Sequence, residues 1–201
     1  MNQFNYLNNN FSITDRSLID LVANECLQLK HQSIDKCAQI FDIWVENNTF
    51  LYIKMELCTE NLNNFLEEKT RIFDRKMTEV MNSIEFYISC QLFRELLESV
   101  KYLHELNPPI IHRNLKPHNI LITKSSKEGH FFKLTDVGFA SLYASIETST
   151  IYSNDSLKYI APEVINKESI TTKTNIFSLG KIAFELFNLK INRFENQNDI
   201  S

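Results

Sequence analysis

Glycine is scarce in this chain. The 201 residues include only three glycines, Gly129, Gly138 and Gly180. Loops that wrap phosphate groups need several glycines within a few positions, because only glycine lets the backbone amides come so close to the phosphate. The three glycines are far apart in the sequence, so this chain carries no glycine-rich phosphate loop.

Cysteine pairs, long apolar runs and a strong net charge are also missing. The four cysteines (Cys26, Cys37, Cys58 and Cys90) form no C-x-x-C pair, which gives no sign of a zinc site or a disulfide framework. A net charge of −4 gives no reason to expect nucleic-acid binding. No apolar run approaches the roughly 20 residues that a membrane helix needs. We therefore expect a protein of the cytoplasm, or of the nucleus, that binds neither nucleic acid nor a membrane.

The most informative stretch that is present is residues 110–121, which read IIHRNLKPHNIL. Three further motifs follow in order: TDVG at 135–138, APE at 161–163 and NIFSLG at 175–180. In this order they resemble four landmarks of protein kinases: the catalytic loop, the D-F-G motif, the A-P-E motif and the start of the central large-lobe helix. Four ordered motifs identify the fold.

The resemblance implies an α+β, protein-kinase-like fold that is truncated at both ends. We expect an asparagine-rich segment at residues 1–14, a partial small lobe of one helix and a β-hairpin at 15–57, and an incomplete, mainly helical large lobe at 58–201. Apolar periodicity and turn signals predict helices at 15–30, 60–69, 83–106 and 172–189. They predict a hairpin of strands 38–45 and 49–57, short strands at 119–122 and 131–134, and an exposed insertion at 70–82.

Three of the helices carry more detailed expectations. In the helix at 83–106, the expected buried stripe is Phe86, Cys90, Phe93, Leu97 and Val100. Apolar residues lie on every side of the helix at 172–189, as in a helix at the centre of a lobe. Because the resemblance implies later large-lobe helices that this sequence does not include, we expect part of the apolar surface of the helix at 172–189 to be exposed to solvent and to promote self-association. In the helix at 15–30, the ion-pairing glutamate that the resemblance implies is Glu25, and another count puts Val22 there.

The catalytic loop departs from the family at the residue that carries its chemistry. Asn114 stands where kinases have the aspartate that accepts the proton of the substrate hydroxyl. An amide cannot take up a proton at neutral pH. Lys116 matches the lysine that meets the transferred phosphoryl group. The resemblance thus makes Asn114 and Lys116 the catalytic positions, with the base lost.

ATP with Mg²⁺ is the cofactor that the resemblance implies. Asn119 and Asp136 would hold the metal, since both offer the hard oxygen ligands that Mg²⁺ prefers. Lys116 would contact phosphate, and backbone groups of Glu56 and Cys58 would face the adenine. Residues 55–58 equally suit the end of a strand, followed by a helix cap at Thr59. No lysine precedes Lys30 to pair the phosphates from the small lobe, so we expect ATP binding to be weak or absent.

Two positions resemble regulatory residues of the serine/threonine kinases. Arg113 matches the arginine that binds a phosphorylated activation loop. Ser156 takes the place of the threonine near the end of the activation segment. Lys116 within L-K-P-x-N is also of the serine/threonine type. Further strings around residues 44–46 and 55–58 look like the Wee-type kinases and the kinases of initiation factor 2 α, between which the sequence does not choose.

Three functions remain open at this point. The first is a catalytically impaired kinase domain, or pseudokinase, that acts as a binding or regulatory module with a protein partner. The second is an active, ATP-dependent serine/threonine kinase whose missing strands come from sequence outside this chain and which acts on a protein substrate. The third is a non-enzymatic scaffold that binds partners through exposed apolar surface.

Overall fold

The computed structural model describes residues 20, 22–24, 26–27, 36–46, 50–76, 78–123, 131–137 and 154–189. Several predictions fall outside these residues: the segment 1–14, Glu25, Gly138, most of the activation segment and everything after residue 189. Within the predicted first helix, residues 20, 22–24 and 26–27 are helical, and Val22 and Cys26 are buried.

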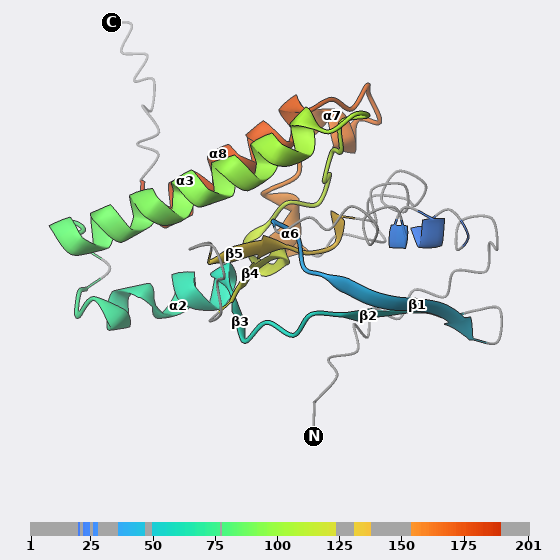
Figure 1. The fold of residues 1–201 in the computed structure, drawn as a ribbon. Helices are drawn as coiled ribbons and strands as arrows, with labels where there is room; N and C mark the ends of the chain where they lie inside the picture. Colours follow the sequence, from blue (N-terminus) through green and yellow to red (C-terminus); the bar gives the residue numbers. More distant parts are fainter. Residues whose placement is uncertain are drawn as a thin grey trace, which may run out of the picture.

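A two-stranded antiparallel hairpin follows that helix, as predicted. Strand β1 (Ile40–Glu46) pairs with β2 (Phe50–Met55), with Trp44 opposite Tyr52. The two rings stack with centroids 5.3 Å apart. The hairpin extends away from the helices labelled α2, α3 and α8, to the right in Figure 1. Both strands are rich in the aromatic and β-branched residues that suit a pleated strand, and they flank a turn signal, which is why the sequence predicted this hairpin.

A second, small sheet lies at the centre of the molecule. Its order is β3 (Glu60–Asn61), β4 (Ile120–Ile122) and β5 (Phe132–Leu134), all antiparallel. The chain just before β1 lies along its edge, because Cys37 bridges Leu134 in parallel and the Ala38 amide donates to the Leu134 carbonyl at 2.9 Å. The predicted strands at 119–122 and 131–134 are confirmed.

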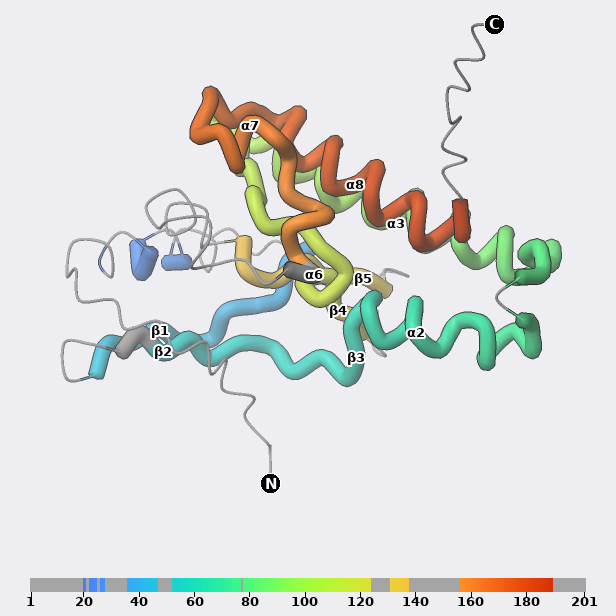
Figure 2. The backbone as a smooth tube through the Cα atoms, turned by 180° about the vertical axis from the view of Figure 1, so that it is seen from behind, coloured from blue at the N-terminus to red at the C-terminus, as the bar shows by residue number. Residues whose placement is uncertain are grey.

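Helices form the rest of the fold. Asn61 caps α2 (Leu62–Ile72) and Asn82 caps α3 (Ser83–Glu105), each accepting from the backbone amide three residues on. Helix α8 (Lys173–Leu186) lies along α3 in both views (Figures 1 and 2). The short η1 (Pro117–Asn119), α6 (Asn154–Leu157) and α7 (Pro162–Ile165) complete the described elements. The α+β class predicted from the sequence is confirmed.

The predicted buried stripe of α3 is wrong for two of its five residues. Phe86 and Leu97 are 54% and 42% exposed, whereas Glu85 is fully buried. Glu85 faces inward because Lys69 of α2 lies 3.3 Å from its carboxylate and Arg75 lies 2.8 Å from it. A stripe built only from apolar residues could not include this charged position. Compared with the predicted face, the buried face of α3 is therefore turned about the helix axis, and Glu85 and Leu96 point inward.

The core lies between α2, α3, α8 and the central sheet. It is made of apolar side chains from these elements and from the loop before η1: Leu62, Leu96, Val100, Leu103, Leu115, Ile120, Phe132, Leu134, Ile182 and Leu186. Lys69 also donates to the carbonyl of Leu186, which joins α2 to α8. Among the described residues, no helix combines the length and apolarity needed to cross a membrane.

Helix α8 is only partly enclosed. Its residues Leu179, Ile182 and Leu186 are buried, whereas Ile176, Phe177 and Phe184 are 54%, 36% and 40% exposed. The expectation that part of the apolar surface of this helix would be exposed to solvent is confirmed.

Candidate active site

The loop at residues 110–116, which resembles the kinase catalytic loop, contacts α8. The backbone N–H of Arg113 donates to Asn175 Oδ1 at 3.2 Å, and Asn175 is fully buried. Arg113 has φ of 65°, in the left-handed region that non-glycine residues rarely adopt. Such a conformation persists only where surrounding contacts enforce it. The Asn175 contact is one of those constraints, so the loop shape depends on α8.

Asn119 closes the loop on itself and on the segment that follows β5. Its side-chain N–H donates to the backbone carbonyl of Asn114 at 2.9 Å. Its own carbonyl accepts from the Thr135 amide at 3.0 Å. Both asparagines are buried, with 6% and 7% of their surfaces exposed. These bonds bring Asn114, Asn119 and the Thr135–Asp136 segment together, although they lie up to 22 positions apart in the sequence.

Lys116 and Asp136 form the charged part of this site. Lys116 Nζ donates to Ser156 Oγ at 2.9 Å, and Ser156 is buried on α6. Burial lowers the pKa of Lys116, and the charge of Asp136 opposes that shift. Burial raises the pKa of Asp136 to about 6, against the effects of Lys116 and Thr135. Asp136 also has a left-handed backbone, with φ of 63°.

These residues fit a magnesium ion in part. Asn119 commits its side-chain N–H to Asn114, so its Oδ1 is the end that remains for a ligand. Asp136 adds a carboxylate whose partial desolvation a cation would offset. The described residues contain no cluster of three or more His, Cys, Asp or Glu able to hold a metal. Mg²⁺ commonly uses one or two protein ligands and takes the rest from phosphates and water.

The predicted adenine-facing segment is tied into the fold by its side chains. The Glu56 carboxylate lies 2.6 and 2.8 Å from Lys133 Nζ and accepts from the Gln39 amide at 3.2 Å. The Glu56 N–H donates to the Gln39 carbonyl at 2.8 Å, so it does not face outward. Burial, and then Glu56, raises the pKa of Cys58 to about 11, which keeps this thiol protonated. In the described part of the chain, no hydrogen bond uses the backbone amide of Cys58.

Sequence reasoning missed Lys133. It lies between the buried Phe132 and Leu134 on β5, so strand alternation places it on the opposite face of the sheet. That alternation was the available signal. Strand alternation could not show that Lys133 pairs with Glu56, because Glu56 lies 77 residues earlier in the sequence.

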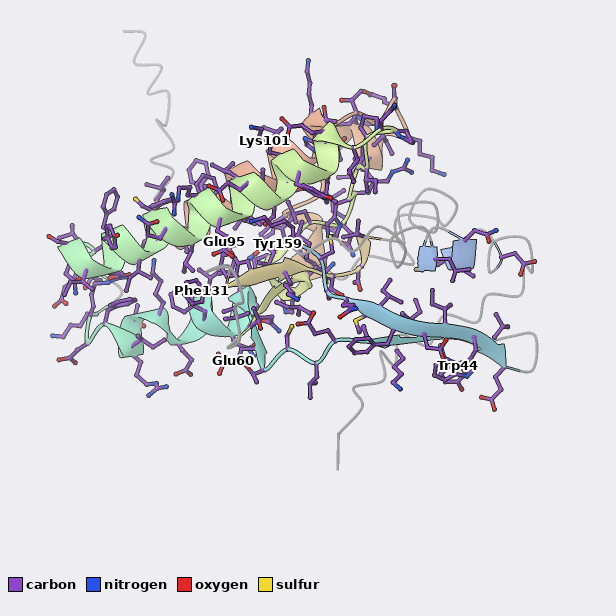
Figure 3. All side chains as sticks on the ribbon, in the orientation of Figure 1. Trp44, Glu60, Glu95, Lys101, Phe131 and Tyr159 are labelled. Carbon is purple, nitrogen blue, oxygen red and sulfur yellow. The ribbon has the colours of Figure 1, made fainter. Side chains whose placement is uncertain are left out.

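Sequence reasoning also missed the polar contacts between α8 and the segment at 156–163. The Thr174 hydroxyl donates to Glu163 at 2.9 Å, and Ser178 donates to the Tyr159 carbonyl at 2.7 Å. The Tyr159 hydroxyl donates to Glu185 at 2.6 Å. Figure 3 shows Tyr159 near the middle of the molecule, well away from Trp44 on the hairpin. Together these contacts fasten the end of the activation segment to α8.

Comparison with known proteins gives one consistent result. Residues 9–201 match the family model described as the protein kinase domain. A probable serine/threonine-protein kinase of Dictyostelium discoideum is 29% identical over 164 residues, covering 80% of this chain and 16% of the relative. The eukaryotic translation initiation factor 2-alpha kinase pek-1 of Caenorhabditis elegans is 29% identical over 188 residues, covering 87% and 16%. The serine/threonine-protein kinase atg1 of D. discoideum is 27% identical over 161 residues, covering 79% and 22%. The chain thus spans about a fifth or less of the length of these relatives.

Proposed function

This chain belongs to the serine/threonine protein kinase domain family, and from that premise we propose that it is a catalytically impaired kinase domain that acts as a binding or regulatory module. Its partner in this role is another protein. Its four free thiols suit a reducing compartment, which supports placing it in the cytoplasm or nucleus.

The proposal rests on Asn114, whose amide side chain stands at the position of the catalytic base and is held in a fixed, buried place. The residue is buried, and its backbone carbonyl is fixed by Asn119, so it occupies a defined place in the loop. An amide at that place cannot accept the proton of a hydroxyl nucleophile. General base catalysis contributes about 10²–10⁴-fold to rate, and this contribution is lost.

The rest of the site supports residual recognition of a nucleotide. Lys116, Asn119 and Asp136 lie on segments that the loop contacts hold together, and they would face the phosphates and metal of Mg²⁺-ATP. Bound magnesium would neutralise phosphate charge there. The sequence offers no opposing glycine loop or lysine, so we propose that this binding is weak.

Two other functions have an observation in their favour. The Lys116–Ser156 bond keeps a catalytic-loop contact in place, which favours an active kinase completed by sequence outside this chain. The exposed Ile176, Phe177 and Phe184 favour a scaffold that needs no nucleotide.

A calorimetric titration with Mg²⁺-ATP separates these functions. We expect a dissociation constant on the order of 100 μM or weaker, with no phosphoryl transfer to a generic protein substrate. The matched control is Asp136→Ala, which removes the carboxylate ligand. Low-micromolar affinity that Asp136→Ala abolishes, together with phosphoryl transfer, would establish the active kinase instead.

A further inference from the structure

The buried side chain of Asn175 joins α3 to the catalytic loop. Its Oδ1 accepts the backbone N–H of Arg113 at 3.2 Å, and its Nδ2 lies 2.9 Å from Nε2 of His104, near the end of α3. Asn175 is fully buried and His104 is half-buried. Helices α3 and α8 thus meet the loop through one amide group.

The contact with Arg113 fixes which way this amide points. A backbone N–H can only donate, so the group opposite it must be the oxygen of Asn175. The NH₂ end then faces His104 and donates to Nε2. That nitrogen must carry a lone pair, which requires a neutral imidazole with its proton on Nδ1.

We propose that His104 and Asn175 form a neutral brace that holds the catalytic loop at Arg113 and releases it when His104 is protonated. An imidazolium presents N–H groups at both nitrogens, so Nε2 would oppose the NH₂ group of Asn175. Turning the amide over would satisfy His104, but it would set NH₂ against the N–H of Arg113. In either arrangement one pair of donors faces each other in a buried place.

The backbone at Arg113 makes the loop sensitive to this loss. Its φ of 65° is a conformation that a non-glycine residue adopts at a cost. Removing the Asn175 acceptor therefore lets the backbone relax toward ordinary values. The Asn175 contact acts on the shape of the loop, whether or not the loop catalyses a reaction.

The surroundings of His104 offer an imidazolium no compensation. On α3, Lys101 and Glu105 pair with each other at 3.6 Å and are mostly exposed. The loop residue that Asn175 contacts is the cationic Arg113, and its neighbour His112 has a pKa that burial lowers to about 4. On α8 the nearest charge in sequence is the exposed Lys173. Burial lowers the pKa of His104, and no charged group among the described residues contributes to that shift.

The choice of asparagine over aspartate sets the direction of the response. A carboxylate at position 175 would attract an imidazolium, so acidification would tighten the contact. The amide gives the opposite behaviour, since acidification breaks it. This contrast provides a test that a purely structural role for the pair would not pass.

The decisive measurement is ¹⁵N NMR of the histidine side chains and loop amides in the whole chain, with a pH titration. We expect His104 to be neutral with its proton on Nδ1 at neutral pH, and to titrate below the ordinary histidine value. The amide signals of Arg113 and Asn114 should shift with the same midpoint. A proton on Nε2 at neutral pH, or loop signals that ignore the titration of His104, would overturn the brace.

Three variants sharpen the result. His104→Gln supplies a neutral carbonyl acceptor, so the loop signals should stay near their wild-type positions and lose their pH dependence. Asn175→Asp should raise the pKa of His104 above its ordinary value, by about one unit or more. His118→Gln, at an exposed histidine of the same loop, is the matched control and should leave the midpoint unchanged. A lowered His104 pKa in Asn175→Asp would contradict the proposal, and the wild-type tautomer decides it if that variant fails to fold.

Discussion

Lys116 donates a hydrogen bond of 2.9 Å to the hydroxyl of Ser156, which lies 40 residues later in the chain. The bond joins the catalytic loop to α6. Ser156 is buried and Lys116 is half-buried, so each satisfies a polar group that water reaches poorly. The loop that carries Asn114 is thus linked to the segment around residue 156.

Replacing Ser156 by alanine should therefore destabilise the fold. The change removes the acceptor of a partly buried ammonium group, which costs about 1–3 kcal/mol of unfolding free energy. Ser156→Thr keeps a hydroxyl and serves as the control. Urea denaturation measures both variants, and a Ser156→Ala protein as stable as the wild type would show that the bond contributes nothing.

Restoring the aspartate at position 114 should not restore phosphoryl transfer. Asn114→Asp returns a proton acceptor that is worth about 10²–10⁴-fold in a complete site. This chain still has no glycine-rich loop and no lysine before Lys30 to position the phosphates. We expect transfer to a generic substrate to stay at background. Robust turnover by this single variant would mean that the remaining residues clamp ATP without those parts.

The buried Glu85 should make stability depend on pH. Burial raises the pKa of this carboxyl, but hydrogen bonds from Arg75 and Lys69 outweigh burial and hold it below the ordinary value. A carboxyl with a lower pKa in the folded state stabilises the fold above its unfolded-state pKa. That stabilisation is lost as the pH falls through the folded-state value.

Urea unfolding of wild type and Glu85→Gln, compared from neutral pH down to about pH 3, isolates this effect. The difference between the two proteins should be largest at neutral pH and shrink in acid. Glu85→Ala should cost about 3–5 kcal/mol, because the buried ammonium group of Lys69 then has no carboxylate to balance its charge. Glu105→Ala breaks only the exposed pair with Lys101 and should cost under about 1 kcal/mol. A constant difference at every pH would contradict the assignment.

The exposed face of α8 should promote self-association. Ile176, Phe177 and Phe184 present apolar surface that water contacts unfavourably. Light scattering should show an apparent mass that rises with protein concentration. The double variant Ile176→Ser, Phe184→Ser should reduce the rise, while Lys173→Ser, an exposed polar change on the same helix, should not. A monodisperse monomer with a sharp, high melting transition would show that the protein is stable with this face of α8 exposed to solvent.

The parts of the fold that follow from local pattern could be predicted from the sequence. Two apolar runs on either side of a turn signal predicted the β1–β2 hairpin, and the order of the four motifs predicted the neighbourhood of Asn114, Asn119 and Asp136. The inward face of α3 could not be predicted this way. Glu85 is buried only because Lys69 and Arg75 approach it from another part of the chain.

The contacts around the site show the same limit. Residue type alone marked Asn175 as a departure from aspartate, but it could not show that its amide meets His104, 71 residues earlier. The Glu56–Lys133 pair likewise joins a residue just after β2 to one on β5, 77 positions later in the sequence. Such pairs depend on three-dimensional packing, and periodicity carries no information about them.

The hairpin also decides what an optical experiment on this protein will report. Trp44 is the one tryptophan in the sequence, and it stacks on Tyr52 with 43% of its surface exposed. Tryptophan fluorescence therefore follows the environment of β1 and β2 alone. Among the elements that the structure describes, α2, α3 and α8 contribute most of the helical signal in far-ultraviolet circular dichroism. If the two signals lose amplitude at different urea concentrations, the hairpin unfolds separately from the helices, and coincident curves make the molecule one cooperative unit.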